Sequence, residues 1–161
     1  MDEKKVRRLL DKQDMLEILY QYCEAADKND PANMTKFFHE DCVVQYVPTE
    51  SIKRGVKQLS DHLFSFLGAV ISGSHYIMNP MFEFVSDDEV LLACYMFSWQ
   101  RFSGYPAQAD AFRFGRYEIR FIRSGETWRM TDMKLLSAGE IGGDRIAEQM
   151  GRPFPPVLFA G

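Results

Sequence analysis

The first half of the chain carries apolar residues at three- and four-residue steps, which is the period of an α-helix. Asp30 followed by Pro31 is typical of a helix start, with Asp30 as the N-cap and Pro31 in the first turn. The pattern predicts a helix over residues 5–28, a short helix from Asp30 through Phe37-Phe38-His39, a strand over 41–47 and a helix over 55–68.

The second half changes to apolar runs separated by turn-forming clusters, which predicts β-hairpins. Pro80 interrupts the first run and predicts a bulge there, because proline cannot donate a ladder hydrogen bond. Helices followed by an antiparallel meander are typical of an α+β fold with the helices packed on one face of the sheet. We expect a single domain over residues 1–161, with 151–161 as a C-terminal tail. The predicted elements of this half are strands over 75–85, 89–102, 111–123 and 128–136 and a helix over about 143–150.

Composition narrows the class of protein. The 161 residues are 46% hydrophobic and carry a formal net charge of −4. The apolar content excludes a disordered chain, and the acidic balance argues against a nucleic-acid binder, whose surface would be basic. No run approaches the roughly 18 apolar residues of a membrane span, and the charged N-terminus is unlike a signal peptide. These features predict a soluble, cytoplasmic protein with neither a nucleic-acid nor a membrane partner.

Motifs for cofactors and metals are absent from the sequence. It contains neither a glycine-rich phosphate loop nor a nucleophile elbow. Cys23, Cys42 and Cys94 are isolated, and the three histidines have no spacing typical of a metal site. His39 and His62 are expected at the surface or near helix ends. We therefore expect neither a cofactor nor a metal.

Asp27 lies on the apolar stripe of the first helix, four, seven and eleven residues after Cys23, Tyr20 and Leu16. Side chains at these offsets share a face, so Asp27 is expected to point inward. A buried carboxylate needs a hydrogen-bond donor, because leaving it unpaired is costly. Asp27 either has a functional partner or only closes the helix end beside Lys28.

His75 opens an apolar strand, where the period of two places it on one face with Ile77 and Asn79. A single histidine on a strand is more often a structural hydrogen-bond partner than a base. A buried aspartate that accepts from one imidazole nitrogen, however, fixes the tautomer and leaves the other nitrogen as a base. Tyr46, on an early strand, is either a donor to a substrate oxygen or a half-buried strand tyrosine.

Several segments spread over residues 12–154 carry a resemblance to a known family. They are Leu19-Tyr20-Gln21-Tyr22, Ala26-Asp27-Lys28-Asn29-Asp30, Ser74-His75-Tyr76-Ile77, Val85-Ser86-Asp87-Asp88-Glu89-Val90, Trp128, Gly143-Asp144-Arg145-Ile146 and Gly151-Arg152. Together they resemble scytalone dehydratase and the SnoaL-like proteins of the nuclear-transport-factor-2-like (cystatin-like) superfamily.

The resemblance implies a strongly curved sheet and helices that form a conical α+β barrel, with an Asp–His pair in its pocket. Asp27 and His75 match that pair by position. The same pair occurs in bile-acid dehydratases and in a hexachlorocyclohexane dehydrochlorinase, where the histidine removes a proton from carbon. Tyr46 matches one of two scytalone dehydratase tyrosines that act on the substrate carbonyl through water. Tyr22 is similar in spacing to a site tyrosine of the bile-acid enzymes.

The chain also departs from scytalone dehydratase at polar positions of the site, so scytalone itself is not the expected substrate. Ala26 replaces the second tyrosine, Trp99 or Gln100 replaces a second histidine, and Gly115 and Tyr117 replace a serine and an asparagine.

These observations predict a cofactor-free, dehydratase-like lyase, or an isomerase or cyclase, acting on a small apolar cyclic molecule. His75 would remove a proton, Asp27 would orient the imidazole, and Tyr46 with Tyr22 would bind the developing oxygen charge. The alternative is a non-catalytic small-molecule-binding or oligomer-assembly module, because fold alone does not decide function. Candidates for the apolar substrate-binding wall are Leu63, Phe66, Phe97, Trp99 and Phe154.

The open face of the sheet is expected to pair with further copies of the chain. An exposed apolar patch is typical of an interface, and family members are dimers or trimers, so we predict a homodimer or homotrimer. A bulge at Gly115 would turn Arg113 or Arg116 into the pocket, but the solvent face is favoured for both. The apolar residues assigned to the open face are Phe97, Trp99, Tyr117 and Phe121.

Overall fold

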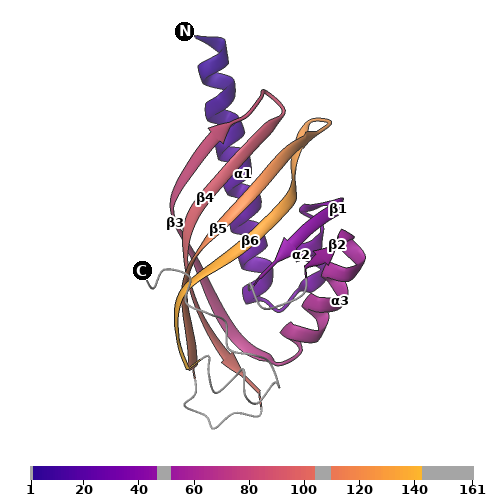
Figure 1. Cartoon of the computed structure of the whole chain (residues 1–161), viewed down its shortest axis with the longest axis vertical. Helices are drawn as coiled ribbons and strands as arrows, with labels where there is room; N and C mark the ends of the chain where they lie inside the picture. The colour runs from indigo at the N-terminus through magenta and orange to yellow at the C-terminus, as the bar shows by residue number, and fades with distance from the viewer. Residues whose placement is uncertain (1, 47–51, 104–109, 143–161) are drawn as a thin grey trace.

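The computed structural model describes residues 2–46, 52–103 and 110–142 of the chain. The chain forms one long helix, two shorter ones and a mixed sheet whose order is β2-β1-β6-β5-β4-β3 (Figure 1). Strands β3 to β6 form an antiparallel meander, and β1 pairs with β6 in parallel. The elements are α1 (Glu3–Asp27), α2 (Pro31–Thr35), β1 (Phe38–Gln45), β2 (Lys53–Arg54), α3 (Gly55–Leu67), β3 (Val70–Phe84), β4 (Glu89–Phe102), β5 (Asp110–Ser124) and β6 (Thr127–Ile141).

Helix α1 confirms the predicted first helix. Asp2 caps its start by accepting from the backbone N–H groups of Lys4 and Lys5. The buried stripe differs from the predicted one at Tyr20, which is 46% exposed. The helix instead turns Met15, Leu19, Tyr22 and Cys23 inward, together with Asp11, Ala25 and Ala26.

The second helix starts where the sequence predicts, because Asp30 accepts from the backbone N–H of Asn33 at 3.0 Å. The prediction that it continues through His39 is wrong. It ends at Thr35, and Phe38 already pairs with Met130 of β6. Pairing with a strand far along the sequence decides this segment, which helical periodicity alone cannot anticipate.

Strand β3 contains the bulge that Pro80 predicts. The register against β4 shifts between Met78 and Met81, and Asn79 adopts the left-handed conformation with φ of +52°. An extra residue on one strand bends it locally, which contributes to the curvature of the sheet.

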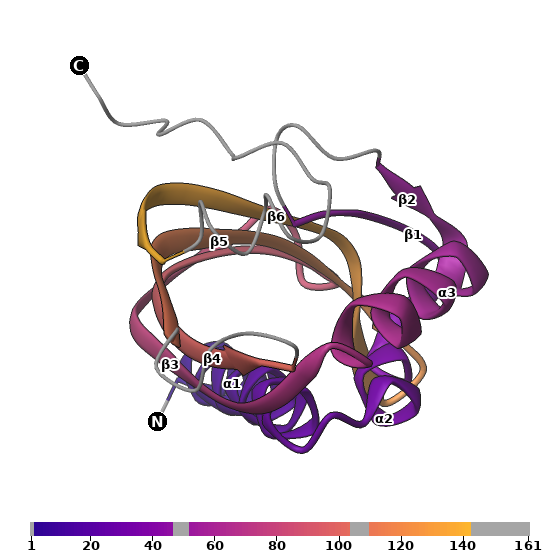
Figure 2. The ribbon, with the colours of Figure 1, turned by 90° about the horizontal axis from the view of Figure 1, so that it is seen from below.

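The sheet has an inner face, against which α1 packs, and an opposite outer face. Phe121 and Trp128 on the inner face and Met15 and Leu19 on α1 belong to the core, each at most 1% exposed. The sheet curls strongly around this face (Figure 2). Its end strands β2 and β3 do not pair, so it is not a closed barrel. The α+β class with N-terminal helices on a strongly curved sheet is thus confirmed.

The predicted C-terminal helix and tail lie outside the described residues. Within the described ranges, no helix is both long and apolar enough to cross a membrane.

Candidate active site

Asp27 and His75 are in direct contact at the end of α1. The Oδ1 atom of Asp27 lies 2.6 Å from Nδ1 of His75, and Oδ2 accepts from the backbone N–H of the same histidine at 3.1 Å. The side chains are only 27% and 11% exposed, respectively. A carboxylate held on both oxygens favours the tautomer with the proton on Nδ1, which leaves Nε2 as the acceptor.

Two tyrosines share a hydrogen bond on the same side of the sheet. The hydroxyls of Tyr22, from α1, and Tyr46, next to β1, are 2.8 Å apart. Burial first, and then the neighbouring Tyr46, raises the pKa of Tyr22 well above its ordinary value. Burial likewise raises the pKa of Tyr117 on β5. The Tyr22 and Tyr117 phenols therefore stay neutral near pH 7 and do not act as bases.

Helix α3 supports Tyr46 through a stack of rings. His62 packs on Tyr46 with ring centroids 5.5 Å apart, and Phe66 packs on His62 at 6.3 Å, each pair at an interplanar angle of 17°. His62 is half-buried and packs between Tyr46 and Phe66. Leu63 is buried in the core on the same helix.

A row of polar side chains crosses the inner face at the level of His75. Ser98 on β4 pairs with His75, Arg113 on β5 pairs with Ser98, and Glu140 on β6 pairs with Arg113. Ser98 is 3% exposed, and Glu140 accepts a hydrogen bond from Nε of Arg113. Directly opposed residues on neighbouring strands face the same side. The polar row thus places an ion pair and a hydroxyl beside the Asp27–His75 contact.

Sequence reasoning missed this row because it favoured the solvent face for Arg113. The register shift expected near Gly115 is present, but the extra residue lies on β6 and leaves Arg113 on the inner face. Every second side chain of β5 faces inward, as buried Tyr117 and Ile119 show, and this alternation also places Arg113 on the inner face. Arg116 does lie on the outer face, where its guanidinium is 5.5 Å from the centroid of the Tyr95 ring.

The proposed apolar wall is only partly brought together. Phe66 reaches the ring stack of Tyr46, whereas Phe97 and Trp99 alternate with Ser98 and lie on the outer face. Phe97 packs there against Tyr76, with ring centroids 5.7 Å apart. These two residues are therefore not next to His75. Phe154 lies outside the described residues.

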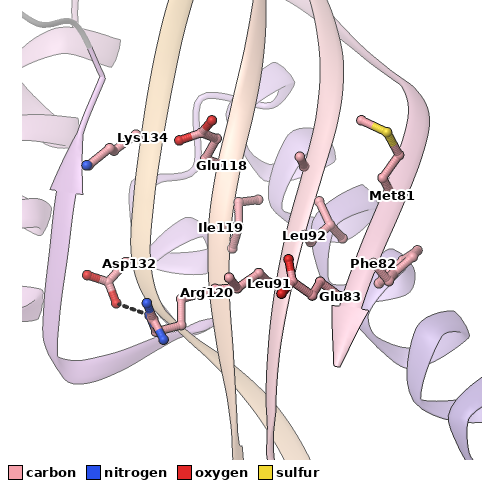
Figure 3. Close-up of a pocket in the computed structure, with 11 residues that line it drawn as sticks. Met81, Phe82, Glu83, Leu91, Leu92, Glu118, Ile119, Arg120, Asp132 and Lys134 are labelled. Carbon is pink, nitrogen blue, oxygen red and sulfur yellow. Dashed lines mark ion pairs between the residues drawn. The ribbon is translucent and has the colours of Figure 1, made fainter. Parts of the chain in front are cut away.

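A hollow of about 560 Å³ lies on the outer face of the sheet (Figure 3). Its lining mixes acids, bases and apolar side chains, and Asp132 forms an ion pair with Arg120 at 3.4 Å. It holds no histidine, cysteine or hydroxyl-bearing residue, so it offers neither a base nor a nucleophile of those types. In the described part of the chain, no three His, Cys, Asp or Glu side chains gather as a metal site. The hollow is lined by Met81, Phe82, Glu83, Leu91, Leu92, Ala93, Glu118, Ile119, Arg120, Asp132 and Lys134.

The fold and the site define a class of small α+β proteins in which a helix-borne carboxylate holds a strand histidine on the inner face of a curved sheet. The family model of the SnoaL-like domain matches residues 7–134. The chain therefore belongs to the SnoaL-like family, as its sequence segments indicate. Comparison with curated protein sequences gives no significant match.

Solved structures show the same fold at low sequence identity. A candidate scytalone dehydratase from Novosphingobium aromaticivorans has a TM-score of 0.80 and 20% identity, covering 86% of this chain and 91% of its own. A hexachlorocyclohexane dehydrochlorinase from Novosphingobium barchaimii has a TM-score of 0.75 and 14% identity, covering 85% and 92%. A Nostoc punctiforme protein with a cystatin-like fold has a TM-score of 0.63 and 19% identity, covering 80% and 91%.

Proposed function

We propose that this protein is a cofactor-free, dehydratase-like lyase, or an isomerase or cyclase, that removes a proton from a small apolar cyclic molecule. The observation that carries the proposal is the 2.6 Å contact between Asp27 and the Nδ1 atom of His75. It is supported by the fold shared with proteins named as a scytalone dehydratase and a dehydrochlorinase. Elimination of water or hydrogen chloride in each named reaction starts from a carbon-bound hydrogen.

In this proposal, Nε2 of His75 takes a proton from a carbon next to a carbonyl, and the electron pair moves to the carbonyl oxygen. Asp27 stabilises the imidazolium that forms. Tyr22 donates to Tyr46, and a phenol that accepts a hydrogen bond becomes a stronger donor. Tyr46 then donates to the enolate oxygen, where a preorganised donor is most effective. Loss of a β-hydroxyl as water, with the proton returned from His75, completes an elimination.

Exchange of α-protons for deuterium tests the base without requiring the natural substrate. We expect the protein to speed incorporation of deuterium from heavy water into 1-tetralone, followed by proton NMR. His75→Ala should lower the enzyme-dependent rate by about 10²–10⁴-fold, the usual contribution of a general base, with an almost unchanged thermal midpoint. His39→Ala, which removes a histidine on β1, is the matched control and should retain the wild-type rate.

Elimination is tested with 3-hydroxycyclohexanone, whose loss of water gives a conjugated enone that is followed by ultraviolet absorbance. Exchange without elimination would favour an isomerase or cyclase over a dehydratase. Exchange that survives in His75→Ala would remove His75 as the base. Absence of exchange, with binding of 1-tetralone retained, would favour the alternative of a non-catalytic binding module. Treatment with a chelator should leave the exchange rate unchanged.

A further inference from the structure

Arg113 and Glu140 form an ion pair on the inner face, in the same row as His75 and Ser98. The Glu140 side chain is 4% exposed and accepts from Nε of Arg113, whose own side chain is 27% exposed. A carboxylate this deeply buried is stable only with a close cationic partner. Glu140 therefore holds the guanidinium in place on the inner face.

Among the described residues, the Nη1–Nη2 edge of the same guanidinium has no hydrogen-bond partner. Glu140 occupies Nε, and no other described residue accepts a hydrogen bond from Nη1 or Nη2 of Arg113. The guanidinium of an arginine is planar, and the two N–H groups on one of its edges can donate to the same oxygen-bearing group. Within the described residues, the pair thus leaves the Nη1 and Nη2 donors without an acceptor on the face that bears His75.

The distance between the two groups suits a ligand of one or two fused rings. His75 and Arg113 are separated by the intervening strand β4, so their Cα atoms are about 10 Å apart. Ser98, the residue between them, contributes a small buried side chain. An apolar molecule that spans this distance would contact the histidine at one end and the arginine at the other.

The charges at the site discriminate between acceptor types. Glu140 neutralises Arg113, and Asp27 adds a second carboxylate on the same face. A ligand carboxylate bound to Arg113 would lie close to Glu140, where repulsion opposes it at short range in a partly buried site. A ketone or alcohol oxygen accepts the same hydrogen bonds without that repulsion.

We infer that Arg113 binds an uncharged carbonyl or hydroxyl oxygen of the substrate and that Glu140 excludes carboxylate ligands from this position. The inference rests on the proposed function and names its substrate class as neutral ketones or alcohols, not acids. Arg113 is a specificity-determining residue in this scheme, and Glu140 is a positioning residue that acts through it.

Binding of two matched probes tests the inference. We would measure the Kd values of 2-acetylnaphthalene and 2-naphthoate, which share a ring system and differ in charge, by ligand-observed NMR. Wild-type protein should prefer the ketone. Glu140→Gln keeps an oxygen acceptor for Nε but removes the charge. It should therefore lower the Kd of 2-naphthoate at least about tenfold and change the Kd of the ketone by less than about threefold.

The control removes a charge from the other face of the same strands. Asp110 accepts from Nε and Nη2 of Arg101 at 2.8 and 3.0 Å, and the guanidinium lies over the outer-face ring of Trp99. Asp110→Asn should leave both Kd values at the wild-type level. The double variant Arg113→Gln with Glu140→Gln leaves no buried charge unpaired, and it should weaken 2-acetylnaphthalene about tenfold.

Three outcomes overturn the inference. The first is a wild-type protein that binds 2-naphthoate more tightly than the ketone, and the second is a Glu140→Gln variant whose affinity for 2-naphthoate rises no more than that of Asp110→Asn. The third is an unchanged Kd of the ketone in the double variant. None of them requires proton abstraction, so deuterium exchange reports on the proposed function separately. Loss of exchange in His75→Ala with the probe pattern intact would support both. If the Kd values of the two probes change as expected but the protein does not speed deuterium exchange of 1-tetralone, only the binding preference is supported.

Discussion

Asp27 satisfies two donors of His75, the ring Nδ1–H and the backbone N–H. Asparagine has nearly the same shape but offers one acceptor and one donor. In Asp27→Asn, either one contact becomes a clash of two donors or the ring proton moves to Nε2, where it blocks the base. We expect the exchange rate of 1-tetralone to fall by about 10²-fold or more. Nitrogen NMR of the His75 ring should show the changed tautomer, which a purely structural role of Asp27 would not produce.

Two outcomes separate the roles of Asp27. A lower rate with an unchanged ring tautomer would indicate that Asp27 acts mainly through charge on the imidazolium. A wild-type rate in Asp27→Asn would show that Asp27 only closes the helix end.

The buried phenols of Tyr22 and Tyr117 predict a loss of stability in alkali. Burial raises both pKa values in the folded protein, whereas the unfolded chain ionises its tyrosines near pH 10. Above that pH the folded state binds more protons than the unfolded state, so the free energy of unfolding falls as pH rises. The expected slope is about 1.4 kcal/mol per pH unit for each group.

Urea unfolding at about pH 9 and about pH 11, on either side of the usual tyrosine pKa, measures this slope. Tyr22→Phe should reduce this slope by the contribution of one phenol, about 1.4 kcal/mol per pH unit. Tyr20→Phe, which alters an exposed tyrosine on the same helix, should not change it. Burial also raises the pKa of the Cys94 thiol to about 11, with the same sign, so only the difference between the variants isolates Tyr22. Equal slopes in both variants would contradict the prediction.

At the scale of elements, Asp11 fixes α1 to the β5–β6 hairpin. Its Oδ1 accepts from Nε1 of Trp128 at 3.2 Å and from Nη2 of Arg123 at 2.8 Å. The Arg123 guanidinium also lies 4.3 Å from the centroid of the Trp128 ring. Asp11→Ala would leave a largely buried arginine and an indole N–H without this acceptor. We expect a cost of about 3 kcal/mol in the free energy of unfolding, measured in urea.

Asp88 offers a matched control for this contact, because it binds the same arginine from a 72% exposed side chain. Asp88→Ala should cost less than about 1 kcal/mol, the usual range for surface ion pairs. Similar costs for Asp11→Ala and Asp88→Ala would show that burial does not distinguish the two partners of Arg123.

Gly115 permits the close approach of β5 and β6 where their register shifts. A Cβ atom at this position would lie 2.6 Å from the carbonyl oxygen of Leu136 and 3.1 Å from Cδ1 of Leu135. Gly139, on the other side of the same irregularity, has no atom within 4 Å of such a Cβ. We expect Gly115→Ala to destabilise the protein by about 2 kcal/mol and Gly139→Ala by less than about 0.5 kcal/mol. Thermal unfolding of the two variants provides the comparison.

The sequence predicts elements whose signals are local. Helical periodicity locates α1 and α3 to within a few residues, and Pro80 marks the bulge of β3. Of the predicted stripe, Cys23 is buried four residues before Asp27 whereas Tyr20 is exposed, and the match to a family pattern adds His75. The contact between Asp27 and His75 in the structure agrees with that match.

What the sequence leaves open depends on pairing between distant strands. Phe38 joins β1 because it meets Met130, which lies 92 residues further along. Tyr117 was expected on the open face with Phe97, but it pairs with Cys94 and is 3% exposed on the inner face. Phe121 is buried on the inner face for the same reason. A strand's period of two gives two faces, and only the register shows which one is covered.

At the scale of the whole molecule, the described helices leave the outer face of the sheet uncovered. Exposed apolar residues there meet across neighbouring strands, and their exposed fractions run from 43% to 62%. Acids and bases alternate around the hollow in Figure 3, such as Glu118 beside Lys134 and Asp132 beside Arg120. Two copies related by a two-fold axis would meet through the same patch of mixed charge and exposed apolar residues on each side. The apolar residues are Tyr76, Met78, Met81, Tyr95, Phe114 and Ile141.

We therefore propose that a second copy of the chain covers this face, in a homodimer or as part of a homotrimer. A stable interface buries about 800 Å² on each partner, and removing two aromatic contacts from its centre should break it. Tyr95→Glu combined with Phe114→Glu should give a monomer in sedimentation analysis, because unpaired charges would be buried between the copies. Phe64→Glu, which alters a 58% exposed phenylalanine on α3, should keep the oligomer. A wild-type monomer, or dissociation by Phe64→Glu alone, would place the interface elsewhere or remove it. Because β4 and β5 carry Tyr95 and Phe114 on one face and Ser98 and Arg113 on the other, dissociation is also expected to slow exchange of 1-tetralone.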